Sequence, residues 1–323
     1  MSCWQGNCSM AAGEAPNGFF FMENTMLMLK TQGWMNLLRA GLVCGVASPL
    51  MASAALVVNP TNDVAQLTSA LIAPGSGINL SGSSLVLGGA TQQGTYSGFN
   101  LAPSSGSTPT LQMQDGVVLT SGGNASVPQS NTVNNYSTAL VGGSGYAPLA
   151  TLASNTTNDA NVLRYNFTLA AGLNAVSMQF VFATDEFPTQ SVTDIFGFFV
   201  DGVNYAKFPS GELISNTPGN PTNFILNPVG GGLYDIEWNG LTQVFTVTGL
   251  INSALSEHTL EIAIADTSDS IFDSAVYVSG LKGVISTTGG GIGDPGTVPE
   301  PGSLALLGAA VLGLAASRQR RAK

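Results

Sequence analysis

The sequence predicts an all-β fold, a two-sheet antiparallel β-sandwich of jelly-roll type with one short N-terminal helix. Three observations lead to this prediction. Apolar and polar residues alternate with a period of two in several short segments, and glycine-containing turn dipeptides lie beside some of them. Only one segment shows the spacing of an amphipathic helix.

The alternation is clearest at residues 163–169, 176–182 and 260–264. Because successive side chains of a strand point to opposite faces, each segment is expected to be a strand with one buried face. This register predicts that four residues face the interior: Phe180, Phe182, Ile262 and Ile264. It predicts that Gln179 and Glu261 face away from the interior.

Two dipeptides are predicted to form tight hairpin turns. Asp201-Gly202 lies between apolar segments at 195–200 and 203–205, and Asn239-Gly240 precedes a strand predicted at 241–248. Both dipeptides readily adopt the positive φ angles that two-residue hairpin loops require.

The helix is predicted at residues 64–71, where apolar side chains share one face. Thr61 or Asn62 can cap its first turn, and Pro74-Gly75 would end it. The Asn- and Thr-rich stretch at 131–161 is expected to supply loops.

The expected mature protein is strongly acidic. Between Ala55 and Thr297 there are three basic and sixteen acidic residues, which give a formal charge of −13. Such a charge repels nucleic acid, so we expect no nucleic-acid partner. Charged residues make up 9% of the whole chain, against about 25% in a typical soluble protein. An uncharged polar surface of this kind suits an extracellular protein.

The N-terminal part has the features of an export signal. Lys30 and Arg39 precede an apolar stretch at 40–50, and Ala52-Ser53-Ala54 supplies the small-x-small pattern of a signal-peptidase site. We predict cleavage after Ala54, so that the mature chain begins at Ala55. The three cysteines all precede this site, which excludes disulfides and Cys-ligated zinc from the mature protein.

The last part of the chain has the order of a removable sorting signal. Val298-Pro299-Glu300-Pro301 precedes an apolar run at 303–316. A helix over that run would rise about 21 Å, less than the roughly 30 Å of a hydrocarbon core, so we expect transient membrane association. A basic cluster follows and would stay cytoplasmic; it consists of Arg318, Arg320, Arg321 and Lys323.

This arrangement resembles the PEP-CTERM signal. The resemblance implies that an exosortase processes the tail and that the rest of the chain reaches the cell surface. An ordinary single-pass tail anchor is the alternative. The chain then divides into an N-terminal extension with signal peptide at 1–54, a β-sandwich domain at 55–285, a Gly-rich linker at 286–297 and the sorting signal at 298–323.

The sandwich domain resembles the choice-of-anchor L domain in five segments: 67–79, 115–122, 180–187, 194–199 and 264–276. The third reads Phe-Val-Phe-Ala-Thr-Asp-Glu-Phe, and it departs from the expected Ser-Glu-Glu-Tyr in its last four residues. The resemblance implies one ectodomain carried on interchangeable surface-sorting tails. It therefore implies surface display rather than a particular reaction.

Acidic residues form two groups, each after the end of a predicted strand. Neighbouring carboxylates repel one another unless a cation neutralises them, and Ca²⁺ takes about six to eight oxygen ligands. The spacing is not that of an EF-hand, so a site would draw on separate loops. The alternative is plain loop chemistry, because Asp commonly bonds to nearby backbone amides. The candidate metal ligands are Asp185, Glu186, Asp194, Asp266, Asp269 and Asp273.

The sequence offers little support for two catalytic interpretations. His258, the only histidine in the sequence, is expected in an exposed turn at 256–258, which gives little support to a serine triad. A two-carboxylate glycosidase could use Glu186 with Asp194 or Asp266, but nothing in the sequence marks these carboxyls as catalytic. We therefore expect no enzymatic activity and no catalytic residues.

The sequence as a whole indicates an exported, surface-delivered structural or adhesive protein of the cell envelope or extracellular matrix. Signal peptidase and an exosortase are its expected processing partners. A polysaccharide-binding module is the first alternative, and a glycosidase is the second. A row of exposed aromatic side chains would favour sugar binding, and a cleft with paired carboxylates would favour the glycosidase.

Overall fold

The computed structural model describes residues 55–288 and 292–293, except for residues 105, 107, 139–142, 191–192 and 216–220. The predicted signal peptide and the predicted sorting signal lie outside the described residues. Among the described residues, no helix is both long and apolar enough to cross a membrane.

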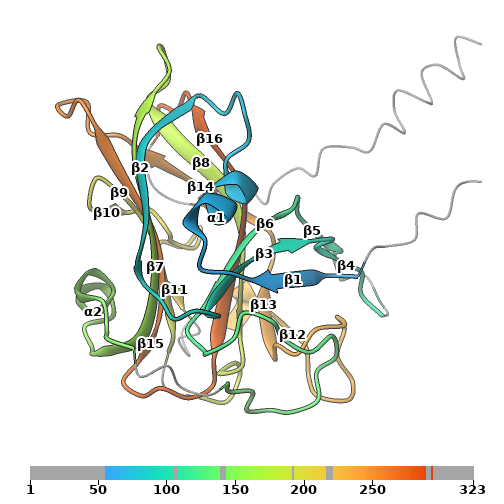
Figure 1. The fold of residues 1–323 in the computed structure, drawn as a ribbon. Helices are drawn as coiled ribbons and strands as arrows, with labels where there is room; N and C mark the ends of the chain where they lie inside the picture. Colours follow the sequence, from blue (N-terminus) through green and yellow to red (C-terminus); the bar gives the residue numbers. More distant parts are fainter. Residues whose placement is uncertain are drawn as a thin grey trace, which may run out of the picture. The chain divides into compact units, whose positions relative to one another are not determined.

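Two antiparallel sheets pack against each other as a sandwich (Figure 1). In the described part of the chain, sheet A contains nine strands and sheet B contains six. A separate pair consists of β4 (Asn100–Leu101) and β5 (Leu111–Gln112). The predicted antiparallel sandwich is confirmed, whereas the strand order does not confirm a jelly roll.

Each sheet has a simple order with one or two branches. In sheet A the main order is β1 (Val57–Pro60), β3 (Gln93–Ser97), β6 (Gly116–Thr120), β16 (Ser274–Val284), β8 (Ala175–Thr184), β13 (Gly240–Thr242) and β12 (Phe224–Leu226). A branch leaves this order at β8, because β14 (Phe245–Leu250) pairs with β8 and with β17 (Ile292–Gly293). In sheet B the order is β10 (Val203–Asn204), β9 (Ile195–Val200), β15 (His258–Thr267), β7 (Thr157–Leu169) and β2 (Ile78–Leu87), and β11 (Ile214–Ser215) pairs with β9.

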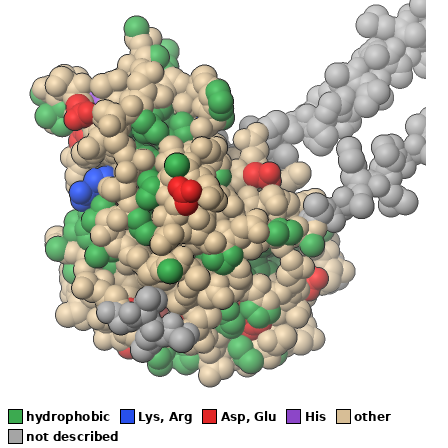
Figure 2. Space-filling model, viewed as in Figure 1, with side chains coloured by type: hydrophobic (Ala, Val, Ile, Leu, Met, Phe, Trp, Pro, Cys, Tyr) green, Lys and Arg blue, Asp and Glu red, His purple; other side chains and the backbone are tan. Residues whose placement is uncertain are grey.

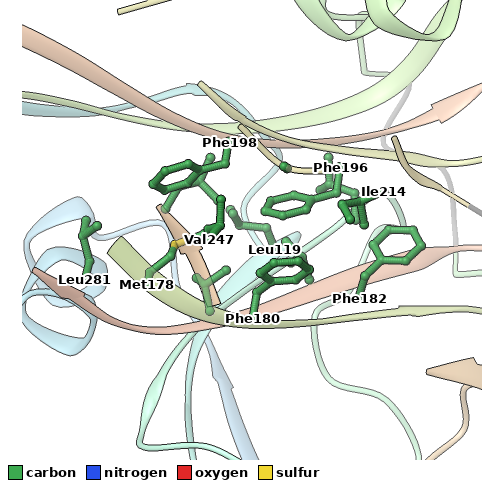
Figure 3. Close-up of a cluster of buried hydrophobic side chains, with 14 of the residues drawn as sticks. Leu119, Met178, Phe180, Phe182, Phe196, Phe198, Ile214, Val247 and Leu281 are labelled. Atoms are coloured by element: carbon green, nitrogen blue, oxygen red, sulfur yellow. The ribbon is translucent and has the colours of Figure 1, made fainter. Parts of the chain in front are cut away.

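The hydrophobic core fills the space between the sheets. In Figure 3 the rings of Phe180 and Phe182 on β8 lie opposite those of Phe196 and Phe198 on β9. The ring centroids of Phe180 and Phe196 are 5.1 Å apart. The core is therefore formed by the inward-facing residues of both sheets, as the period of two predicts.

The predicted register of β8 and β15 is confirmed. Phe180, Phe182 and the two isoleucines of 260–264 are fully buried in this core. Gln179 and Glu261 are only half-buried. Truncating Phe180 or Ile262 therefore removes core volume, whereas truncating the half-buried Gln179 removes little.

The outer faces of both sheets are also largely covered. Over sheet A, Trp238 and Phe99 pack in a second cluster with Tyr277 of β16. Over sheet B, the helix α2 (Ala147–Ala153) buries Leu149 in a third cluster, which includes Phe199 of β9. Because β9 is buried on both faces, its sequence is a continuous apolar run rather than an alternating one.

The structure contains more helix than the sequence predicts. The predicted helix is present as α1 (Val64–Leu71), but its N-cap is Asp63, whose Oδ1 accepts from the backbone N–H of Ala65 at 2.9 Å. The second helix, α2, and a 3₁₀ turn η1 (Pro221–Asn223) contradict the expectation of one helix. No side chain caps the N-terminus of α2, so the usual sequence signal is missing.

One of the two predicted hairpin turns is present. Asp201 and Gly202 have φ angles of 49° and 80°, and they join paired residues Val200 and Val203. The prediction of a turn at Asn239-Gly240 is wrong, because Gly240 belongs to β13 and pairs there with Thr184 of β8. A Cβ at Gly240 would lie 2.7 Å from the Cβ of Phe187, so this glycine is required by close packing.

Candidate functional site

The core strands of sheet B end in two facing carboxyl groups. On β15, Asp266 occupies the inward position that follows Ile264, and on the neighbouring strand Asp194 immediately precedes β9. Ala265 pairs with Ile195, so the two aspartates are next to each other beyond that pair. Both side chains are fully buried.

Two serines of sheet A lie against this pair. Ser121 follows β6, and Ser274 begins β16; the Ser121 hydroxyl lies beside the Asp266 carboxyl and the Ser274 hydroxyl beside that of Asp194. The backbone N–H of Ser274 donates to Ser121 Oγ at 3.0 Å. The hydrophobic core thus gives way to a buried polar layer at this end of the sandwich.

The oxygens of the aspartate pair have few hydrogen-bond donors. Among the described residues, neither oxygen of Asp194 or of Asp266 accepts a hydrogen bond of good geometry, and Ser274 Oγ is likewise buried without one. The backbone N–H of Asp194 donates to Glu186 Oε2 at 2.8 Å, which brings a third carboxyl close to the pair.

Burial sets the electrostatics of the pair. It raises the pKa of Asp266 to about 8, and the nearby Ser121 hydroxyl offsets only part of the effect. The pKa of Asp194 is raised well above its usual range by burial and then by the charges of Asp266 and Glu186. Among the described residues, Arg164 pairs with Glu261 and the His258 ring lies against Asp201, and neither contact includes a residue of this layer.

Asp185 and Asp273 have a different role. The Asp185 carboxylate accepts from the backbone N–H of Tyr136 and, at 3.1 Å, from that of Asn239. Asp273 Oδ2 accepts from both the backbone N–H and the hydroxyl of Thr138, each at 2.7 Å. These two carboxyls therefore fasten the segment 131–138, which covers the outer face of sheet A at Trp238.

The sixth predicted ligand, Asp269, is partly exposed. Its Oδ1 accepts from the backbone N–H of Ile271 at 3.5 Å, which is the turn chemistry named as the alternative. No group of three or more His, Cys, Asp or Glu side chains in the described residues is arranged to hold a metal ion. The structure brings Asp194 and Asp266 together, and the metal role of the six acids stays a prediction.

The expectation that His258 is exposed is wrong. Its side chain is buried at the start of β15, and Nδ1 lies 2.9 Å from Oδ2 of Asp201. Asp201 also accepts from the backbone N–H of Asn252 at 2.8 Å and of Thr259 at 2.9 Å. This pair ties the β9–β10 hairpin to β15, and the long sequence separation hides it from sequence patterns.

The carboxyls considered for a glycosidase are closed to solvent. Glu186, Asp194 and Asp266 each have an exposed fraction of 0%. A sugar cannot reach them in this conformation, so the geometry does not support that chemistry.

Ser121 and Ser274 are the site residues that sequence reasoning missed. A signal for them exists, because each occupies the next inward position after a core residue, Leu119 on β6 and Val276 on β16. Extending the period of two beyond the apolar part of a strand would have found both.

Comparison with known families gives two matches. The model of the choice-of-anchor L domain matches residues 57–281, and that of the PEP-CTERM protein-sorting motif matches residues 297–321. No match was found among curated proteins or among solved structures.

Proposed function

Because the chain belongs to the choice-of-anchor L domain family and carries a PEP-CTERM protein-sorting motif, we propose that it is a structural or adhesive module without catalytic activity. The sorting motif identifies it as an exported protein that an exosortase processes and that reaches the cell surface. The proposal concerns what the sandwich does there.

The observation that carries the proposal is the placement of the aromatic side chains. Among the described residues, most Phe, Tyr and Trp side chains are buried in the clusters inside and outside the sheets, and the remaining four, Tyr136, Tyr146, Tyr205 and Phe272, are half-buried. A row of exposed aromatic rings, which would favour sugar binding, is therefore missing from the described part of the domain. The face drawn in Figure 2 is mostly uncharged: acidic side chains are scattered over it, basic side chains lie in one place on the left, and apolar side chains are interspersed among polar ones. Such a surface suits packing against other polar surfaces.

A polysaccharide-binding module remains the alternative. A groove beside β1 is lined mainly by aliphatic side chains, among them Leu56, Val58 and Pro128, and no aromatic residue contributes to it. It therefore offers no stacking platform for a sugar ring. The third candidate, a glycosidase, lacks support because the carboxyls it would use are buried.

Surface assays separate these functions. Cells producing the full chain are compared with cells lacking it and with cells producing a chain truncated before Val298, and attachment and cell–cell aggregation are measured. The full chain alone should increase either property. The purified full-length protein is also incubated with extracellular polysaccharides. Retention on a polysaccharide would replace the proposal with the binding alternative, and release of reducing sugar would replace it with the glycosidase.

A further inference from the structure

We propose that Asp194 and Asp266 together bind one Ca²⁺ ion inside the sandwich, with the hydroxyls of Ser121 and Ser274 as further oxygen ligands. This inference is independent of the adhesive role, because it concerns what completes the fold.

The four proposed ligand side chains lie together at one end of the sandwich. The two carboxyls lie on adjacent strands directly beyond the pair Ala265 and Ile195, and the two serines face them from the opposite sheet. The four side chains come from β6, β9, β15 and β16 or from residues next to these strands. Rigid strands thus hold the oxygens in place, as a preorganised binding site requires.

Most of the proposed ligand oxygens lack hydrogen-bond partners. Five side-chain oxygens of Asp194, Asp266 and Ser274 are buried without a hydrogen-bond partner of good geometry among the described residues. Buried polar atoms in native proteins are nearly always satisfied by protein groups, water or ions. Here the unsatisfied atoms are all oxygens and four of the five belong to carboxyl groups, so one bound cation would satisfy them together.

Nearby carboxyl groups make the electrostatic potential at the aspartate pair negative. Glu186 and Asp273 add negative potential at Asp194, and Asp273 and Asp159 add it at Asp266. An ionised pair in this environment is unfavourable unless it is neutralised. One divalent cation neutralises both carboxylates at once. Protons are the competing solution, because one or both carboxyls could stay protonated.

The kind of ligand atom at the site indicates which ion it would bind. The expected mature chain has no cysteine, and its histidine is paired with Asp201, so the site offers oxygen alone. Oxygen ligands suit Ca²⁺, which also accepts backbone carbonyls and water in flexible geometry. A site with only two carboxylate ligands is expected to bind Ca²⁺ weakly. Extracellular calcium modules have such weak affinities, with Kd on the order of 10⁻⁴ to 10⁻³ M.

The test uses the purified full-length protein, treated with EGTA and then titrated with CaCl₂ in a calorimeter. Thermal unfolding is followed with EGTA and with millimolar CaCl₂. The wild type should release or absorb heat at one site per chain, and its Tm should rise with calcium. Asp266→Asn should lose both signals yet unfold no earlier than the wild type in EGTA, because a neutral amide of nearly the same shape replaces the buried carboxyl. Asp269→Asn is the matched control and should keep both signals.

A second pair of variants guards against misfolding. If Asp266→Asn does not fold, Asp194→Asn and Ser274→Ala provide the same comparison, and the wild-type titration stands without any variant. Absence of both heat and Tm shift in the wild type would overturn the proposal and leave protons as the neutralising species. A calcium-induced shift that persists in Asp266→Asn and in Asp194→Asn would overturn it too, because the ion would then bind elsewhere.

Discussion

Asp266 lies directly beside Asp194, one residue beyond the paired residues Ala265 and Ile195, so the strands that build the hydrophobic core also carry the buried acid pair. The same alternation that turns Ile264 and Phe196 inward turns these two aspartates inward. The polar layer is therefore a continuation of the core rather than a feature of the loops.

The core register makes a prediction about stability. Phe180→Ala and Ile262→Ala should each lower the free energy of unfolding by about 2 to 5 kcal/mol, because both side chains are fully buried between the sheets. Gln179→Ala on the outward side should change it by less than about 0.5 kcal/mol. Urea denaturation checks all three, and a wild-type midpoint for Phe180→Ala would show that β8 faces the other way.

The anchoring of the segment 131–138 makes a second prediction. Asp273→Ala removes the acceptor of the Thr138 backbone N–H and hydroxyl, and it should cost about 1 to 3 kcal/mol of unfolding free energy. Limited proteolysis should cut the segment sooner than in the wild type. Asp269→Ala serves as the control, since Asp269 is partly exposed and makes one long bond. Equal cutting rates in the two variants would contradict the anchoring role.

Asp185 makes the domain's stability depend on pH. Burial raises its pKa to about 7, although two backbone N–H groups oppose the shift, and the charges of Glu237 and Asp273 add to it. The unfolded pKa is about 3.9, so the folded state holds more protons between about pH 4 and pH 7, and stability falls as pH rises through this range.

The measurement is Tm in EGTA at pH 5 and at pH 8. The wild type should melt at a higher temperature at pH 5, and Asp185→Asn should show a smaller difference because its amide does not titrate there. Asp115→Asn, which leaves this end of the domain unchanged, is the control. An unchanged pH difference in Asp185→Asn would show that the carboxyl of the folded wild type is already ionised at pH 5, and would contradict the raised pKa.

Gly240 makes a prediction about packing. Gly240→Ala brings a methyl group to 2.7 Å from the Cβ of Phe187, which forces β13 or the 187–188 segment to move. We expect a loss of about 1 to 3 kcal/mol. Gly231→Ala, where a Cβ would meet no atom within 4 Å, should be close to neutral by comparison. Equal denaturation midpoints for the two variants would contradict the close packing.

Much of the fold could be predicted from local pattern, and the errors have physical causes. The alternation at 163–169 and 176–182 identifies β7 and β8 because their inward and outward sides differ. Asn239-Gly240 has the composition of a turn, but the glycine serves packing against Phe187 instead. The helix α2 has no capping side chain, so it resembled a loop.

The candidate site was predicted only in part. Clustering of acids along the chain predicts that Asp194 and Asp266 lie at the same end of the sandwich, and the structure places them side by side there. It could not separate Asp273, which binds Thr138, from Asp266, which faces Asp194, because both partners lie far away in sequence. The burial of His258 was missed for the same reason, since Asp201 reaches it from another hairpin.

The intact mass of the protein recovered from the cell surface shows whether both ends of the chain are cleaved. The sorting motif at 297–321 and the predicted signal peptide require two cleavages. We expect the mass of a chain that begins near Ala55 and ends close to Pro299-Glu300-Pro301. A surface protein that still carries Arg318 to Lys323 would contradict exosortase processing and indicate a permanent tail anchor.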